Sequence, residues 1–409
     1  MNRRSEKDFT RERKMPFTML VLFLANNIQS SISLELHKFF NSFSDSLNPI
    51  DPSSIFKARQ KLKFSAYSQL STVIKEGFYQ HSPQVRKWKD FCLMGIDGST
   101  IQLPNTEDLR KKFFNKENSR PLARLSSLVD VCNGVIHDVA LTPTSVDERT
   151  LALQHFAKLQ KDSLLLTDRG YACAWIMAYL MQEGKHFCMR QAIGKSKQIQ
   201  DFIDSGQQDV IIDYSLSKSS IETLKSFNMD APDTIQIRLV RVELDNGGVE
   251  VLATSLMHQE EFPREEFGPL YHYRWGHEKV YRELKCYESL QEWSGKKELC
   301  IMQDLHATVM LHNLKCCFYA QVDDSQKTMR EASRNELKYD YQANHKATFS
   351  VLRLHFWELF SPIKCTRNLL KFCLSAMVKI RPHPIRENRK SPRNFTYPMK
   401  PMAFAYKPC

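Results

Sequence analysis

The sequence predicts an α/β protein whose core is a mixed β-sheet, with a β-rich insertion and with helical segments on either side. Three observations predict this class. Short apolar runs alternate with helical stretches from residue 91 to 190, β-branched and polar residues alternate from 192 to 267, and helical periodicity prevails towards both ends of the chain. A chain of 409 residues is long enough for two to four modules around a substantial core.

The amino-acid composition indicates which kinds of binding partner and which cellular compartment suit this chain. The chain has 58 Lys and Arg against 46 Asp and Glu, and its net charge of +12 favours a polyanion, nucleic acid before membrane. The 11 cysteines include no CxxC pair and no spacing typical of secreted proteins, which indicates reduced thiols of a cytoplasmic protein and not a zinc site. The apolar run 16–25 is too short to span a bilayer and no cleavage site follows it, so a buried helix is expected there.

Residues 1–88 are expected to be helical. One apolar stripe repeats at helical spacing and consists of Leu36, Phe39, Phe40 and Phe43. A second helix is predicted to start near Ser53 and to run through a segment with several basic residues, Arg59 among them. Those basic residues could grip a duplex or form an ordinary solvated face, and the pattern alone favours neither interpretation.

The segment from 91 to 190 reads as a succession of short buried strands and helices. The predicted strands are 91–96, 125–131, 134–141, 163–168 and 186–190, and the predicted helices are 147–160 and 171–183. Asn133-Gly134 is a strong signal for a two-residue hairpin between the second and third strands.

Two aspartates stand at the ends of predicted strands. Asp97 follows the first strand and Asp168 ends a later one. If the two strands are parallel neighbours, their carboxylates lie close together and could hold a hard divalent cation. Each aspartate also has an ordinary explanation, because Asp97-Gly98 can form a turn and Asp168 can cap the helix that begins near Gly170.

Residues 192–267 follow a different pattern. β-branched and polar residues alternate in three predicted strands, 210–216, 234–244 and 249–256, and a turn is expected at 245–248. This β-rich segment therefore separates the last core strand from the helix predicted next.

The stretch 271–285 is predicted to form one helix with sorted polar residues. At about 100° per residue, one face within roughly 60° carries four side chains: Tyr271, Arg274, Glu278 and Lys285. A surface ion pair between Glu278 and Arg282 is the simpler explanation for part of this pattern.

The C-terminal part is predicted to be helical and then basic. Helices are expected at 298–320 and 341–360, and the segment from 361 to 409 has eleven Lys and Arg against one acidic residue. The end of the chain could follow a phosphate backbone or serve as a disordered solubilising tail.

Four motifs together resemble those of DDE transposases of the insertion-sequence-four group. They are GIDGST around Asp97, Glu148-Arg149, LTDRGY around Asp168, and the spacing Tyr-x2-Arg-x3-Glu-x6-Lys that begins at Tyr271. The resemblance extends over nearly the whole chain and implies a ribonuclease H-like catalytic core. It implies four segments: a helical DNA-binding region 1–88, the core 89–191 plus 268–325, the β-rich insertion 192–267, and a helical, basic region 326–409.

The resemblance also implies roles for single residues. It makes Asp97, Asp168 and Glu278 the catalytic ligands of Mg²⁺ or Mn²⁺, with two ions expected. It makes Tyr271, Arg274 and Lys285 contacts to DNA, and Arg169 and Arg190 are further basic candidates. His277, beside the glutamate, could tune that carboxylate or pack against the core.

The function implied is cut-and-paste transposition of an insertion sequence. Such an enzyme binds terminal inverted repeats, cleaves the element ends and transfers their 3′-hydroxyls to target DNA, as a homodimer in a synaptic complex. A location in the cytoplasm at the nucleoid is expected, without a membrane partner. Two alternatives are an inactive transposase derivative that only binds DNA, against which the intact carboxylate set argues, and a ribonuclease H-like nuclease without strand transfer.

One feature departs from the group. Its hairpin-forming members hold a flipped base against an aromatic residue of the β-insertion, notably Trp. All five Trp of this chain lie outside 192–267, although that segment has other aromatic residues such as Tyr214. Whether a DNA hairpin forms is therefore left open by the sequence.

Overall fold

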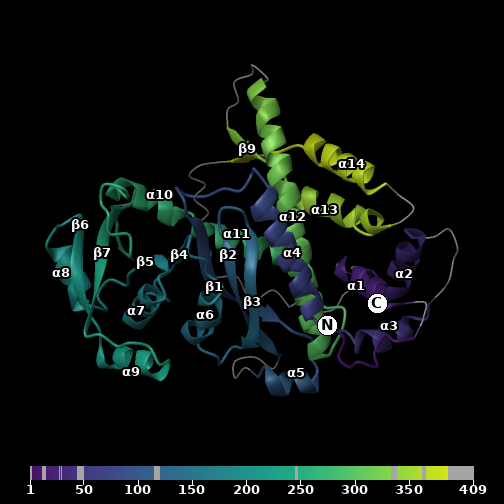
Figure 1. The fold of residues 1–409 in the computed structure, drawn as a ribbon, viewed down its shortest axis with the longest axis horizontal. Helices are drawn as coiled ribbons and strands as arrows, with labels where there is room; N and C mark the ends of the chain where they lie inside the picture. The colour runs from purple at the N-terminus through teal and green to yellow at the C-terminus, as the bar shows by residue number, and fades with distance from the viewer. Residues whose placement is uncertain are drawn as a thin grey trace. The chain divides into compact units, whose positions relative to one another are not determined.

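The structure is a computed structural model that describes residues 2–11, 15–26, 28, 30–43, 50–114, 120–244, 247–332, 339–361 and 365–385 (Figure 1). The described residues cluster into two compact units. The sheet unit comprises Arg86–Ser99 and Arg124–Val280, and the helical unit comprises the segments up to Val85, Thr100–Ala123 and from Tyr281 onwards. Each unit combines several of the segments delimited from the sequence, and the domain boundaries given above stay predictions.

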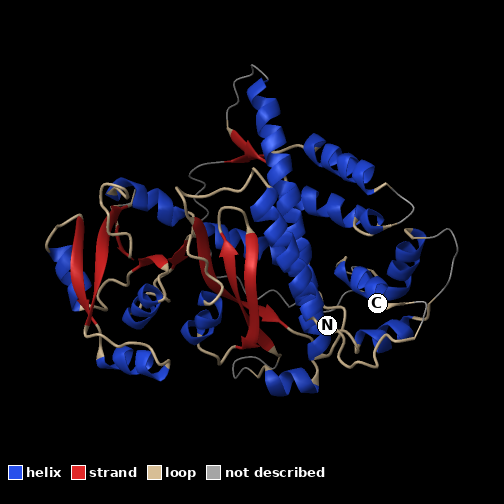
Figure 2. Cartoon of the chain, in the orientation of Figure 1, coloured by secondary structure: helices blue, strands red, loops and turns tan. Residues whose placement is uncertain are grey.

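Strands are drawn in red in Figure 2. Eight of them form a mixed sheet that lies mainly in the sheet unit and has the order β3-β2-β1-β4-β5-β8-β7-β6. The strands are β1 Cys92–Gln102, β2 Leu122–Asp130, β3 Val135–Pro143, β4 Ser163–Thr167, β5 His186–Arg190, β6 Asp209–Ser215, β7 Thr234–Glu243 and β8 Val249–Thr254. Strands β1, β4 and β5 are parallel, whereas β8, β7 and β6 continue the sheet antiparallel. The predicted α/β class with a mixed-sheet core is confirmed.

The central strands form because their sequences are apolar on both faces. All five residues of β4 are buried, as are the first five of β1, which is typical of parallel strands covered on both sides. The predicted two-residue hairpin is wrong: a four-residue turn, 131–134, joins β2 to β3. The Asp130 carboxylate accepts hydrogen bonds from the N–H groups of Cys132 and Asn133 at 3.0 and 3.1 Å. These bonds stabilise the four-residue turn over a two-residue turn.

The three strands predicted in the insertion are present as β6, β7 and β8, and they extend the core sheet. The segment also contains two helices that its alternating pattern did not predict, α8 Lys197–Asp204 and α9 Lys218–Ser226. The Ser217 side chain caps α9 by accepting the Ser220 N–H at 3.2 Å. Part of the predicted turn, residues 245 and 246, lies outside the described residues.

The predicted single helix over 271–285 is wrong, because the stretch forms two helices, α10 Phe267–His272 and α11 Trp275–Cys286. Between them, the Arg274 N–H bonds the Tyr271 carbonyl at 3.1 Å, a tighter i to i−3 connection. The first turn of α11 also approaches the β2–β3 turn closely, since a Cβ on Gly276 would lie 2.6 Å from the Val131 carbonyl oxygen. Tyr271 and Glu278 therefore do not share one continuous helical face.

Two further helices of the sheet unit carry residues of the site, α6 Glu148–Phe156 and α7 Ala174–Gln182, and both were predicted at about these positions. The helical unit contains α1 Phe17–Ala25, α2 Ile32–Asn41, α3 Pro52–Arg59, α4 Ser65–His81, α5 Glu107–Lys112, α12 Glu298–Ala332, α13 His345–His355 and α14 Thr366–Lys379. It also has the short 3-10 helix η2, Glu358–Phe360, and a strand pair, β9 Asp340–Gln342 with β10 His383–Ile385; a second 3-10 helix, η1 Arg264–Glu266, belongs to the sheet unit.

The core of the helical unit contains the apolar residues expected from the sequence. Phe23 and Phe39 are fully buried with ring centroids 5.4 Å apart, and Trp357 stacks on Phe23 at 6.1 Å. The helix predicted at 16–25 is α1, as expected, and the helix predicted to start near Ser53 is α3, which ends at Arg59. Arg59 is itself 1% exposed and paired with Asp304 at 2.5 Å, so it is not available to a duplex.

No helix of the described residues is long and apolar enough to cross a membrane. The basic tail from 386 to 409, and Lys364 before it, lie outside the described residues.

Candidate active site

The two aspartates are neighbours across the sheet. The prediction that Asp97 stands at the end of its strand is wrong, because β1 continues past it to Gln102, whereas Asp168 directly follows the last residue of β4 as expected. Strands β1 and β4 are parallel with Gly95 opposite Leu166, and the same register continued by two residues sets Asp97 beside Asp168. Adjacent strands are about 4.8 Å apart and equivalent positions face the same side, so both carboxylates project together. Each is anchored by a following amide: Asp97 Oδ1 accepts the Gly98 N–H and Asp168 Oδ1 accepts the Gly170 N–H, both at 2.8 Å.

Glu278 lies on the first turn of α11, with 44% of its side chain exposed. Its Oε1 is 3.2 Å from Nη2 of Arg274, four residues earlier, so the ion pair seen here is with Arg274 and not the one with Arg282 considered from the sequence. The Arg274 guanidinium lies over the exposed ring of Trp275, 4.7 Å from its centroid. Trp275 was not predicted as a residue of the site, although its position between Arg274 and Glu278 could have indicated it.

The three carboxylates share one electrostatic environment. Burial raises the pKa of Asp97 to about 6, and the negative charges of Asp168 and Glu278 act in the same direction, while the Gly98 N–H and Arg274 oppose them. Such mutual repulsion between carboxylates is relieved when a cation binds. Oxygen donors of this kind suit hard divalent ions.

Tyr271 is placed differently from the expectation of a DNA contact. Only 6% exposed, it donates its hydroxyl to the carbonyl of Thr167 at 3.1 Å, and Thr167 directly precedes Asp168. Burial raises the pKa of Tyr271, which therefore stays protonated as the donor. The contact ties α10 to the end of β4.

His277 is a buried packing residue between α11 and the sheet. Its Nε2 lies 3.1 Å from the Ser127 carbonyl and 3.2 Å from the Ser127 hydroxyl. Burial lowers the pKa of His277 to about 3, so the ring is neutral at pH 7. A neutral imidazole adds no charge beside Glu278.

A basic cavity of about 850 Å³ lies at the end of β5 and the start of α7. The register of β4 with β5, continued by one residue, sets Arg190 beside Asp168, and Arg190 pairs with Glu250 at 2.9 Å. The cavity is lined by Arg149, Arg169, Arg190 and Lys195, by the aromatic rings of Trp175 and Tyr214, and by several serines. Cationic, hydroxyl and aromatic groups are those that bind phosphate and stack on bases.

Lys285 belongs to the helical unit, where its ammonium donates to the Thr100 carbonyl at 3.0 Å. Burial lowers the pKa of Lys285.

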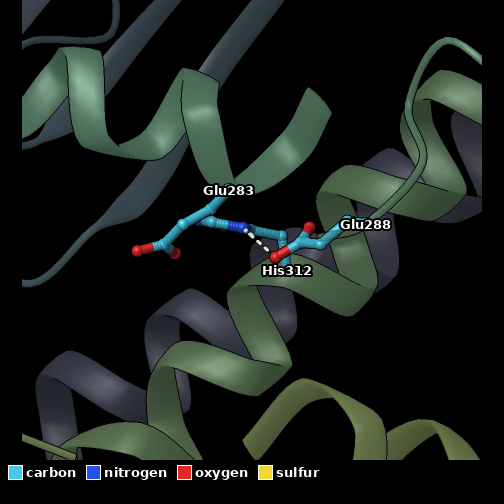
Figure 3. A group of neighbouring side chains, drawn as sticks. All are labelled: Glu283, Glu288 and His312. Atoms are coloured by element: carbon cyan, nitrogen blue, oxygen red, sulfur yellow. Dashed lines mark hydrogen bonds and ion pairs between the residues drawn. The ribbon is translucent and has the colours of Figure 1, made fainter. Parts of the chain in front are cut away.

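A second group of potential ligands lies in the helical unit. Among the described residues, Glu283, Glu288 and His312 are a group whose candidate ligand atoms all lie within 4.8 Å of one another (Figure 3). However, the ammonium of Lys315 lies 2.5 Å from Glu283 Oε2 and 3.2 Å from Glu288 Oε1. His312 Nδ1 adds a 2.8 Å contact to Glu288. Because Lys315 already supplies the positive charge, this buried network is an ion-pair cluster and not a metal site.

Comparisons with known proteins agree with the sequence motifs. The family model "Transposase DDE domain" matches residues 88–314. The transposase InsG for insertion sequence element IS4 of Escherichia coli (strain K12) is 24% identical over 320 residues, which cover 74% of this chain and 70% of that protein. A cryo-EM structure of the piggyBac transposase synaptic complex with hairpin DNA aligns with a TM-score of 0.44 at 10% identity, over 92% of this chain and 78% of that one. Since the family model matches more than half of the 409 residues, this chain belongs to the DDE-domain transposases.

Proposed function

We propose that this transposase uses Asp97, Asp168 and Glu278 as its metal ligands in cleaving and joining the ends of an insertion sequence. DNA is the substrate and divalent metal ions are the cofactor class of the family. The observation that carries the residue assignment is the register of β1 with β4, which supports two adjacent carboxylates on one face of the sheet. The raised pKa of Asp97, to which Asp168 and Glu278 both contribute, supports the inclusion of the glutamate.

The donor set fits two Mg²⁺ or Mn²⁺ ions better than one. The three carboxylates are not among the described groups whose ligand atoms all lie within 4.8 Å, as a single shared ion would favour. Two ions about 3.5–4 Å apart would allow their ligands to lie further from one another, and Asp97, Asp168 and Glu278 would hold them. When bound, such ions would activate a water or a 3′-hydroxyl and stabilise the departing oxygen.

The protein side chains would orient the DNA around these carboxylates. Arg274 balances the charge of Glu278 and is available to a phosphate once that charge is neutralised. Arg169 directly follows Asp168, and Arg190 lies beside it on β5 by the strand register. Both line the basic cavity, which suits a phosphate backbone. Tyr271 supports this arrangement from the protein interior, because its hydroxyl donates to the Thr167 carbonyl at the end of β4.

Removing the Tyr271 hydroxyl separates bracing from DNA contact. Tyr271→Phe is expected to lower the free energy of unfolding by about 1 kcal/mol, the usual cost of one buried hydrogen bond, and to leave DNA affinity unchanged. The matched control is Tyr273→Phe, since Tyr273 is 46% exposed two residues away. Denaturant titrations and gel-shift measurements give the two readouts. A loss of DNA binding without a loss of stability would show that Tyr271 contacts DNA and does not act by bracing β4.

Strand transfer distinguishes a transposase reaction from simple hydrolysis. We expect the full-length protein, given Mg²⁺ and a pre-cleaved element end with a free 3′-hydroxyl, to join that end to a target plasmid. Joined products would be detected by sequencing across the junctions, where a short target duplication should appear. Two ends must be held together for this reaction, so a homodimer on DNA is proposed, measurable by light scattering of the complex. Hydrolysis without joined products would instead indicate a nuclease.

A further inference from the structure

The first turn of α6 lies against the backbone next to each aspartate, at Gly98 within β1 and at Gly170 just beyond β4. Its direction is fixed by the N-cap Asp147, whose carboxylate accepts the Thr150 N–H at 2.9 Å. Glu148 and Arg149 are the next two residues, in the first turn of a helix whose inner face, with Leu151 and Ala152, is buried. The helix therefore holds the backbone of both residues in place.

Arg149 holds the loop of Asp168. Its Nε donates to the Gly170 carbonyl at 2.7 Å, and the Gly170 N–H in turn donates to Asp168 Oδ1 at 2.8 Å. Arg169 and Gly170 are exposed, so packing does little to fix this loop. The guanidinium of Arg149 thus restrains the peptide that orients the Asp168 carboxylate.

Glu148 holds the segment after Asp97. Nε of Arg124, on β2, pairs with Glu148 Oε1 at 3.0 Å and fixes its carboxylate. That same oxygen lies against Gly98, because a Cβ added at Gly98 would be 2.6 Å from it. The Gly98 N–H is the group that holds Asp97 Oδ1, so Glu148 confines the peptide that orients the first aspartate.

These two contacts oppose the repulsion between the aspartates. Before a cation binds, the negative charges of Asp97 and Asp168 favour separation of β1 from the end of β4 at this point. We propose that Glu148 and Arg149 are positioning residues that hold the backbone beside Asp97 and Asp168 in place, so that ions bind a site already formed. The inference rests on the proposed ligand assignment. Residues that orient metal ligands in this way typically contribute 10–100-fold, roughly, to metal affinity.

Metal affinity, measured without catalysis, tests the role of Arg149. Titration of the full-length protein with Mn²⁺, with free Mn²⁺ followed by electron paramagnetic resonance, should show Arg149→Ala binding about 10–100-fold more weakly than wild type. The Mg²⁺ concentration for half-maximal cleavage should rise likewise, while the rate at saturating Mg²⁺ recovers to within a few-fold. Arg149→Lys should lie between the two, because an ammonium can still reach the Gly170 carbonyl. Arg264→Ala, at another partly exposed arginine of the sheet unit, is the control and should leave Mn²⁺ affinity unchanged.

Arg149 also lines the basic cavity, which gives a competing explanation. If Arg149 only binds DNA, Arg149→Ala will weaken gel shifts in EDTA and leave Mn²⁺ affinity at the wild-type value. That result would overturn the positioning role.

The contact between Gly98 and Glu148 allows a double-mutant test. Gly98→Ala should weaken Mn²⁺ binding, since its methyl group displaces the Glu148 carboxylate. In a Glu148→Ala background the clash is gone, so adding Gly98→Ala should have little further effect. Equal losses in both backgrounds would show that Glu148 does not act through Gly98.

The variants distinguish a wrong positioning role for Glu148 and Arg149 from a wrong assignment of the metal ligands. If Asp97→Asn still cleaves DNA, the ligand assignment is wrong. If Asp97→Asn is inactive while Arg149→Ala and Glu148→Ala bind Mn²⁺ like wild type, the ligands stand and only the positioning role is refuted.

Discussion

Asp97→Asn is expected to reduce metal-dependent strand cleavage by about a thousandfold or more, and Asp168→Asn and Glu278→Gln should do the same. Metal ions contribute several kcal/mol of stabilisation to phosphoryl transfer, and each 1.4 kcal/mol or so corresponds to a factor of about ten in rate. An amide keeps the size of the carboxylate but loses the charge that holds a cation. Cleavage of an end-labelled element fragment in Mg²⁺ measures the effect.

The amide variants should remain folded and should still bind DNA. Burial raises the pKa of Asp97 to about 6, above the value of 3.8 of an ordinary aspartate, so its ionised form at pH 7 is less favourable in the folded chain than in the unfolded one. Asp97→Asn should therefore melt at the wild-type temperature or above it. Asp162→Asn is the control, because Asp162 precedes β4 and makes only a half-exposed pair with Lys87 at 2.8 Å. Wild-type nicking rates in all three variants would disprove the assignment.

The sequence predicted the end of β4 well because local composition determines it. All five residues of β4 are buried, three leucines form its centre, and the first charged residue, Asp168, marks where the chain leaves the core. The end of β1 was predicted wrongly, since the strand continues through Asp97 to Gln102. The pairing of β1 with β4 was inferred only as a possibility. Which strands become neighbours depends on the topology of the whole sheet, and a single sequence does not encode that in any short window.

The site details that failed depend on tertiary contacts. The helical periodicity placed Tyr271 and Glu278 on one face of a single helix, but the helix is interrupted between α10 and α11. Just after this interruption, Gly276 lies so close to the Val131 carbonyl that a Cβ would not fit there. Burial of Tyr271 follows from its bond to Thr167, more than 100 residues earlier in the chain. Arg59 was counted with the exposed basic residues, but its partner Asp304 is equally remote in sequence. Periodicity identifies a face and leaves open what that face contacts.

Lys315→Met is expected to destabilise the protein by about 3–5 kcal/mol, the usual cost of leaving buried charges without their partner. Lys315 is 1% exposed, and its ammonium contacts the buried carboxylates of Glu283 and Glu288. Typical domains are stable by only about 5–15 kcal/mol, so the loss should be visible as a large fall in the denaturant midpoint. Lys327→Met is the control on the same helix, since Lys327 makes only a solvent-exposed pair at 3.9 Å, a class that contributes roughly 0–1 kcal/mol.

Neutralising the partners should reverse the effect of Lys315→Met. With Glu283→Gln and Glu288→Gln added, no buried carboxylate remains uncompensated, and much of the lost stability should return. If Glu283→Gln and Glu288→Gln each lowered the stability of Lys315→Met further, the residues would contribute by packing and not as a charge cluster.

The same cluster predicts how stability varies with pH. Burial would raise the pKa of Glu288, but His312 and Lys315 outweigh it and lower that pKa, and for Glu283 the charges of Lys315 and His345 do the same. Burial opposes protonation of His312, yet Glu288 outweighs it and raises the pKa of His312 to about 10. The glutamates thus stabilise the fold above their unfolded pKa of 4.5, and this stability is lost on acidification. The contribution of His312 is complete below its unfolded pKa of 6.5 and is lost as the pH rises through about 10.

The free energy of unfolding should therefore be greatest between about pH 5 and 6.5 and should decline towards pH 10. His312→Gln should remove that alkaline decline, because the variant has no proton to lose over this range, although it is less stable than wild type at pH 6. His37→Gln, on α2 and exposed, should keep the wild-type profile. Urea titrations at several pH values between 5 and 10 provide the measurement. A wild-type profile that stays flat from pH 6.5 to 10 would mean that His312 is not charged in the folded protein, and Lys315 alone would then balance two carboxylates.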